Sequence, residues 1–340
     1  MSQGILPFFI RSCPRLEVVI LNDSPGREAV DMLWSLNALE RVECTLHGME
    51  TSEFWDANCD LINLARAPAL SYLSVSAPWD YGEAAWYQSD YEPMPFASLK
   101  TLKLFHFPYE DTLVALLEKL DAPLLQTLEI GALHELERYD EDHFASLLGL
   151  LEKFPQLRAL NISGLGIDEP LTLQPSLKLW GLEELEIDIL DAVDESFVSQ
   201  LARACPQLRR FVGYTGPHEY ASPWDLNVLE ECAASMPRLE YLHTEFYTEY
   251  MDELKEPTAR SLVPITIMVG NSRLAEEDWG QVAAYIAKIY PNAICRQWPS
   301  LEWDDMADDE LVSNTRRWRW VSRAVAEVGS RLNLIHDEDT

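Results

Sequence analysis

Short apolar segments recur along the chain, and the second half of each alternates between hydrophobic and polar residues. The clearest are LSYLSV (70–75), LKTLKL (99–104), LQTLEI (125–130), LRALNI (157–162) and LEELEI (182–187). An alternation with a period of two residues predicts a β-strand with one buried and one solvent-facing side. Because these segments share the spacing Leu-x-x-Leu-x-apolar, they predict repeated copies of one structural unit.

The first leucines of these units have the spacing of a leucine-rich repeat. They are Leu16, Leu39, Leu70, Leu99, Leu125, Leu157, Leu182, Leu208, Leu239 and, more weakly, Leu262. Their mean separation is about 27 residues, and repeats of about 20–29 residues commonly pair each strand with a helix. We therefore predict an α/β solenoid of about ten irregular units, with a curved parallel sheet inside and mostly helices outside.

A proline precedes the strand leucine in six units. These are CPRL (13–16), APAL (67–70), APLL (122–125), FPQL (154–157), CPQL (205–208) and MPRL (236–239). Proline has no N–H and disfavours helix in the residue before it, so it should end an outer helix and pass the chain to the strand.

The segments between the predicted strands show helical periodicity. In 110–121, acidic residues open the segment and four leucines share one face of a helix. Comparable patterns occur at 141–153 and 194–204, weaker ones at 27–36 and 225–235, and a long amphipathic one at 274–289.

Residues 79–96 interrupt this alternation. The segment WDYGEAAWYQSDYEPMPF is rich in tryptophan, tyrosine and acidic residues, and it contains two prolines. It predicts a loop in place of a helix. Such a loop could bind a ligand or could only fold over the repeat array, and its role stays open.

The end of the chain departs from the repeat pattern. We expect LVPITIMVG (262–270) to be the last strand of a solenoid over 1–270, and 271–340 to be a capping region of the same domain. A helical stripe comprises Trp320 or Val321, Ala324, Val325, Val328, Leu332 and Ile335. Repeat arrays need an end cap with a polar outer face, and this helix suits that role.

The chain is strongly acidic, with 57 acidic and 26 basic residues and a formal net charge of −31. Such a charge should repel nucleic acid and anionic membranes and should attract a basic protein partner. The alternative is that the acidic residues only keep a long solenoid in solution.

Several sequence features favour a cytoplasmic or nuclear protein. No apolar run approaches the roughly 18 residues that a membrane span needs, and the start of the chain lacks the basic region of a signal peptide. The six cysteines are sparse and have no metal-ligand spacing, so we expect them to be reduced and buried.

The residues predict no enzymatic chemistry. The chain has no phosphate-binding loop, no dinucleotide-binding glycine motif, no H-E-x-x-H and no G-x-S-x-G. The seven histidines include no close pair, and the acidic run at 302–310 lacks the pattern of a calcium loop. We therefore expect no cofactor, no metal and no catalytic residue.

The residues between the strand leucines should form the concave, ligand-binding face. The candidates are Tyr72, Phe105, Glu129, Glu184, Glu186, Asp188, Tyr214, Tyr241, His243 and Glu245. Tyrosine gives a large contact area at low entropic cost, and carboxylates can bind Arg or Lys. Our hypothesis is a basic protein ligand across 184–245, and the alternative is a solvated face without a ligand.

The units CPRLEVVIL, CPQLRRF and MPRLEYLHT resemble the repeats of ribonuclease-inhibitor-like solenoids. More specifically, residues from about 10 to 270 resemble the irregular repeats of fungal F-box proteins. The resemblance implies that the repeats select a substrate, while an F-box would dock onto the adaptor of a ubiquitin ligase. Because the first unit begins by Leu16, we expect no F-box in this chain and no adaptor contact through one.

A second functional class fits the same composition. A free-standing acidic inhibitor or chaperone would mask a basic protein mainly through charge. Salt distinguishes the two classes, because screening weakens long-range charge attraction more than it weakens contacts anchored by buried aromatic rings.

Overall fold

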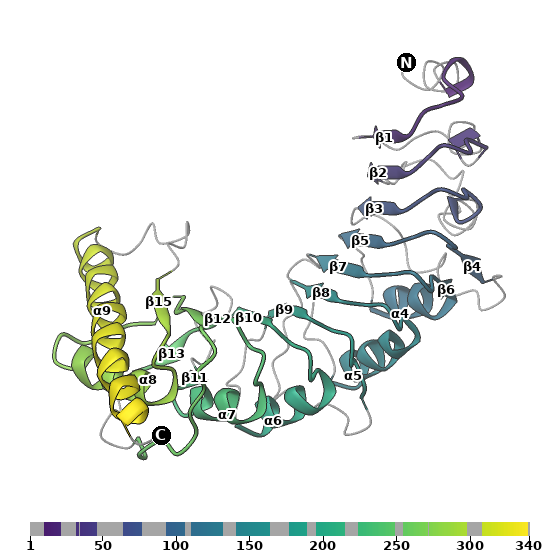
Figure 1. Ribbon diagram of the computed structural model, residues 1–340. Helices are drawn as coiled ribbons and strands as arrows, with labels where there is room; N and C mark the ends of the chain where they lie inside the picture. The colour runs from purple at the N-terminus through teal and green to yellow at the C-terminus, as the bar shows by residue number, and fades with distance from the viewer. Residues whose placement is uncertain are drawn as a thin grey trace. The chain divides into compact units, whose positions relative to one another are not determined.

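The computed structural model gives the chain as two compact units, Met1–Leu165 and Gly166–Thr340 (Figure 1). The described residues are 10–21, 32–33, 35–45, 64–76, 93–105, 110–131, 141–163, 177–188, 195–214, 224–248, 254–270, 272–297 and 308–338. Most of the predicted helix at 27–36 and of the predicted loop at 79–96 lies outside these ranges.

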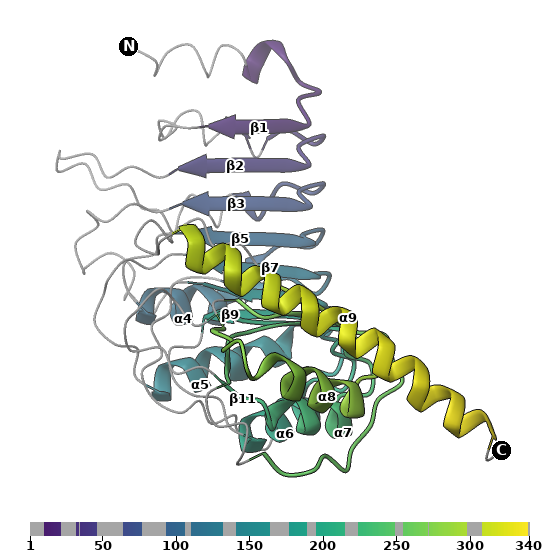
Figure 2. The same ribbon diagram turned by 90° about the vertical axis from the view of Figure 1, so that its left-hand side faces the viewer.

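The first unit contains a parallel sheet whose strands follow one another in chain order (Figure 2). The strands are β1 (Val18–Leu21), β2 (Arg41–Thr45), β3 (Tyr72–Ser76), β5 (Thr101–Phe105), β7 (Thr127–Gly131) and β8 (Ala159–Ile162). The short strands β4 (Met94–Pro95) and β6 (Leu120–Asp121) pair separately. The outer elements are α4 (Glu110–Lys119), α5 (Glu141–Leu150) and the 3-10 helix η1 (Leu151–Lys153).

The second unit repeats this design. Its parallel sheet comprises β9 (Glu184–Asp188), β10 (Arg210–Tyr214), β12 (Tyr241–His243), β14 (Thr266–Met268) and β15 (Ile294–Arg296). A second pair joins β11 (Trp224–Asp225) to β13 (Phe246–Tyr247). The helices are α6 (Glu195–Ala204), α7 (Val228–Ser235), α8 (Trp279–Ile289) and α9 (Asp308–Glu338).

Equivalent leucines of neighbouring strands lie side by side in the core. Leu102 pairs with Leu128, and Leu128 pairs with Leu160. Each of these side chains is at most 2% exposed. Burial of one such side chain stabilises the fold by about 1.5–3 kcal/mol. Stacked parallel strands with outer helices and a shared leucine core make this an α/β leucine-rich repeat solenoid, as the sequence predicts.

A tight turn leads into most strands of the repeats. The N–H of the first leucine donates to the carbonyl three residues earlier, as from Leu208 to Cys205 at 3.1 Å and from Leu239 to Met236 at 3.1 Å. The repeated proline occupies the second position of this turn, where its fixed φ is favoured. Pro206 and Pro237 therefore shape the turn itself, in addition to excluding a helix.

Most predicted elements are confirmed where the structure describes them, but two assignments near 262–296 were wrong. Leu262 is 59% exposed, whereas Ile265 is 2% exposed and takes the core position of that unit. Strand β15 pairs with β14 in parallel, although the sequence analysis placed 294–296 in the capping region. The helix predicted over 274–289 begins at Trp279.

Helix α9 covers the last strand of the second unit. It packs against α8 and β15 (Figure 1). The N–H of Cys295 in β15 donates to the Ser322 hydroxyl at 3.2 Å. Gly329 lies so close to Pro291 that an added Cβ would stand 2.0 Å from the Pro291 carbonyl oxygen. The helix therefore protects a strand edge that could otherwise pair with another chain.

A buried polar network fixes the start of α9. Asn314 is 3% exposed, accepts a hydrogen bond from the Leu274 N–H at 3.0 Å and donates to the Ser272 carbonyl at 3.0 Å. The Trp318 indole donates to the same carbonyl at 2.9 Å. Of the two alternatives in the predicted stripe, Val321 is buried and Trp320 is 36% exposed.

Replacing Asn314→Ala should lower the free energy of unfolding by about 2–3 kcal/mol, because the buried Leu274 N–H loses its acceptor. Urea denaturation followed by tryptophan fluorescence measures this change. The matched control is Ser330→Ala, whose hydroxyl bonds within the helix to Ala326 and is exposed, so a loss below about 0.5 kcal/mol is expected. Equal losses in the two variants would contradict the role of Asn314.

Candidate protein-binding face

Three side chains are joined across neighbouring strands on the solvent face of the second unit. The Arg210 guanidinium of β10 forms an ion pair with Glu186 of β9 at 3.1 Å. The same guanidinium lies 4.9 Å from the ring centroid of Tyr241 on β12. The side chains of Arg210 and Glu186 are 34% and 23% exposed, so this cluster is ordered and still open to a ligand. We call Glu186, Arg210 and Tyr241 the arginine clamp.

In the next row of the same face, the positions on β10 and β12 beside Glu186 are closed. Val212 is 0% exposed and His243 is 4% exposed. Desolvation, together with the charge of Arg210, lowers the pKa of His243 from 6.5 to about 4, so its ring is neutral at pH 7. His243 therefore offers little surface to a ligand, although the sequence analysis included it among the binding residues.

The other predicted residues of this unit differ in their exposure. Glu184 is exposed at the start of β9, and Glu245 is half-buried and lies against Gly270, a residue with φ of +49°. The backbones of Asp188 and Tyr214 end their strands, but their side chains lie outside the described part of the structure.

The solvent face of the first unit also carries paired charges. Lys103 forms an ion pair with Glu129 on the neighbouring strand, and this hydrogen bond raises the pKa of Lys103. Arg41 bonds Glu43 on its own strand and lies 4.2 Å from the ring centroid of Tyr72. The carboxylate of Glu129 is therefore already neutralised by a neighbour.

Phe105 occupies the end of β5. Its ring lies over Gly131 of β7, where an added Cβ would stand 2.5 Å from the nearest ring carbon. Gly131 has to be a glycine, because any side chain at this position would collide with the ring. Phe105 remains half-buried, so one side of the ring contributes to the face.

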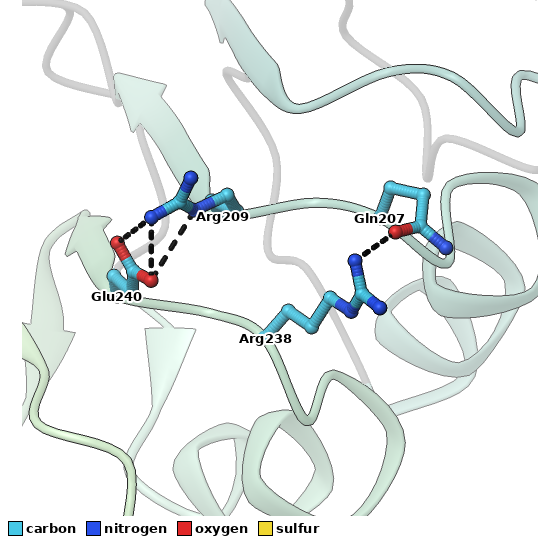
Figure 3. Close-up of polar contacts among 4 residues, drawn as sticks. All are labelled: Gln207, Arg209, Arg238 and Glu240. Atoms are coloured by element: carbon cyan, nitrogen blue, oxygen red, sulfur yellow. Dashed lines mark hydrogen bonds and ion pairs between the residues drawn. The ribbon is translucent and has the colours of Figure 1, made fainter.

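A second set of lateral contacts marks the edge where the strands of the second unit begin (Figure 3). Arg209 forms a bidentate ion pair with Glu240, with two distances of 2.8 Å. Arg238 donates to the side chain of Gln207 in the equivalent turn of the preceding repeat. The side chains of Arg209 and Glu240 are about half exposed, and such an ion pair contributes roughly 0–1 kcal/mol.

The cysteines behave as core residues. Cys44, Cys205, Cys232 and Cys295 are buried and unbridged. Burial raises the pKa of Cys205 and of Cys295 to about 12, so neither thiol is reactive at neutral pH. Among the described residues, no three His, Cys, Asp or Glu side chains gather into a metal site, and no helix is long and apolar enough to cross a membrane.

The chain matches no protein-family model and no curated protein sequence. Its fold is similar to a chain of the yeast Rad7–Elc1 complex, with 14% identity and a TM-score of 0.40 over 91% of this chain and 87% of that one. It is also similar to a chain of the TLR13–ssRNA13 complex, with 14% identity, a TM-score of 0.37 and coverage of 83% of this chain and 44% of that one.

A protein from Bacteroides fragilis is similar at 15% identity and a TM-score of 0.30, over 84% of this chain and 67% of that one. Similarity at these levels assigns neither a ligand nor an activity to this chain. The assignment of the fold therefore rests on the repeat geometry described above.

The sequence analysis missed the cations of the strand faces. Tyrosines and carboxylates were chosen as ligand contacts, and Arg210 and Lys103 of the same strands were left out of that choice. A signal was present in the alignment of repeats, since each cation stands one strand away from a carboxylate. The carboxylates of Glu129 and Glu186 are consequently compensated by a cation of the neighbouring strand.

Because the pKa of His243 is lowered on folding, we predict that the stability of the protein depends on pH. Above pH 6.5 the ring is neutral in both states, but below it the unfolded chain takes up a proton that the folded chain does not. Between pH 7.5 and pH 5 the protein should therefore lose about 2 kcal/mol of stability through this one group.

Urea denaturation of the wild type and of His243→Gln across this range measures the effect. Glutamine does not titrate, so the variant should show a shallower decline by about that amount. All other titrating groups are shared by the two proteins and cancel in the comparison. Parallel declines would mean that His243 keeps its ordinary pKa.

Proposed function

We propose that this chain is a non-enzymatic protein-interaction module and that the solvent face of β9, β10 and β12 binds its ligand. The observation that carries the proposal is the arginine clamp, in which a guanidinium is held between a carboxylate and an aromatic ring while it stays partly exposed. Arg and Tyr are common among the residues that dominate binding energy. Because neighbours already fix these side chains, less entropy is lost on binding.

The proposed ligand is a protein segment that carries basic side chains. Glu184 is exposed beside the clamp and supports this choice, as does the net charge of −31. Arg210 compensates Glu186, so Glu184 is the stronger candidate for direct contact with a cation of the ligand. Tyr241 then supplies a half-buried ring for an apolar or planar group of the ligand.

The resemblance to F-box repeats supports a finer proposal. In that family the repeats select the substrate of a ubiquitin ligase, and the F-box contacts the adaptor. We propose that the strand face of this chain has the selecting role. The adaptor contact belongs to the F-box in that family, so the proposal concerns only the ligand of the repeats.

The second candidate function is masking of a basic protein by an acidic chain. The excess of 57 acidic over 26 basic residues favours it. It predicts binding through many weak charge contacts instead of a few anchored residues. Its affinity should consequently fall steeply with salt, whereas binding at the clamp should persist at moderate ionic strength.

Capture of partners from a native lysate at low and at moderate salt, read by mass spectrometry, tests both candidates. We expect a discrete protein that is retained at both salt concentrations by the wild type. Arg210→Ala/Tyr241→Ala should weaken that complex by at least about tenfold, because both anchors are lost. The matched control Arg203→Ala/Trp180→Ala removes a cation and an exposed aromatic residue outside the clamp and should leave the complex unchanged.

Three results would contradict the proposed function. Assorted basic proteins that all dissociate at moderate salt would support masking. Retention of the complex by the clamp variant would place the ligand on another surface. Equal losses in the clamp and control variants would show that the binding does not depend on the clamp.

A further inference from the structure

Helix α9 presents a row of arginines on the side opposite its buried stripe. Its buried side consists of Asn314, Trp318, Val321, Val325 and Gly329. Arg316, Arg319 and Arg323 are exposed. Their spacing of three and four residues places them on one face of the helix, within about 10 Å along its axis. We call these three residues the arginine row.

Among the residues that the structure describes, the arginine row has no carboxylate partner. Ion pairs occupy other described cations, including Lys103, Arg209 and Arg210. Within the described part of the chain, no ion pair or hydrogen bond involves the side chains of the row. Three adjacent guanidinium groups therefore face solvent without a carboxylate partner there, in a protein with a net charge of −31.

An aromatic residue is fixed beside the row. Trp320 lies between Arg319 and Arg323 in sequence and is 36% exposed. Its ring centroid lies 5.8 Å from that of Trp279 on α8, with a tilt of 58°. Val312, one turn before Arg316, is 56% exposed. The row therefore combines exposed cations with apolar surface that a neighbouring helix holds in place.

We propose that the arginine row and Trp320 bind an acidic segment of a partner protein that has apolar side chains among its carboxylates. Guanidinium groups bind carboxylates in a bidentate manner, and tryptophan is among the commonest anchors of protein interfaces. The charges of such a segment complement the row, and its apolar side chains complement Trp320 and Val312.

A nucleic acid fits this surface less well. It carries a charge on every nucleotide, and the −31 of the chain opposes its approach. An acidic segment interrupted by apolar residues carries fewer charges for the same contact length. Part of its binding comes from apolar burial, which the overall charge does not oppose.

The proposed surface is independent of the strand face. The residues of the row belong to α9, whereas the arginine clamp belongs to β9, β10 and β12. A variant of one surface leaves the other unchanged, so each proposal can fail while the other stands.

The test uses the full chain and a fluorescein-labelled peptide in which pairs of Asp and Glu alternate with Leu and Phe. Fluorescence anisotropy at low salt should show saturable binding. Arg316→Glu/Arg319→Glu/Arg323→Glu should weaken it by at least about tenfold, and Trp320→Ala should weaken it by several fold. A peptide with Ser in place of Leu and Phe should also bind less tightly.

The matched control is Arg15→Glu/Arg66→Glu/Lys100→Glu, which reverses three exposed cations of the first unit and changes the net charge by the same amount. It should alter the affinity by less than about threefold. Thermal unfolding of both triple variants checks that they fold like the wild type. A variant that does not fold is replaced by the corresponding change to glutamine.

Several results would overturn the proposal. These are the absence of saturable peptide binding to the wild type, equal losses in the two triple variants, and full affinity for the Ser-substituted peptide. Single-stranded RNA and vesicles that contain phosphatidylserine are measured in parallel. Tighter binding of either probe than of the peptide, with the same dependence on the arginine row, would assign the surface to that class of ligand instead.

Discussion

Lateral pairing between equivalent parallel strands is the interaction on which the rest of this protein depends. In the first strand positions, two successive N–H groups donate to one carbonyl of the preceding strand, as Arg209 and Arg210 do to Glu183 at 2.8 and 3.0 Å. These two hydrogen bonds set the register, and the register brings the core residues of neighbouring strands side by side, as for Leu185 and Phe211. The turn before each strand can then be the same in every repeat, while the outer connections differ in length.

The same register organises the solvent faces. Because equivalent positions stand one strand apart, a cation in one repeat meets a carboxylate or a ring in the next, as for Lys103 and Glu129 or for Arg210 and Tyr241. Such cross-strand pairs are individually weak. Their effect is to hold long side chains in one arrangement, so that a face built from flexible residues becomes an ordered surface.

The repeated strands could be predicted from the sequence because their apolar spacing is local. Strand β15 was missed because it has one buried core residue, Cys295, between the exposed Ile294 and Arg296. The assignment of Leu262 failed because another apolar residue, Ile265, stands three positions later. At the candidate site, the pairing of Arg210 with Glu186 and Tyr241 depends on register between distant segments, and the burial of Val212 and His243 depends on tertiary packing. The alignment of repeats gives the register, but a single-sequence pattern does not contain the burial.

The close approach of α9 to the end of the second unit prevents the addition of another repeat after β15. Gly329 against Pro291 and Ser322 against the N–H of Cys295 occupy the edge at which a further strand would pair. A repeat added after β15 would have to displace the helix and its buried Asn314 network. A gene duplication that lengthened this protein would therefore be tolerated inside the array, where a new repeat meets a strand on both sides, but not directly after β15.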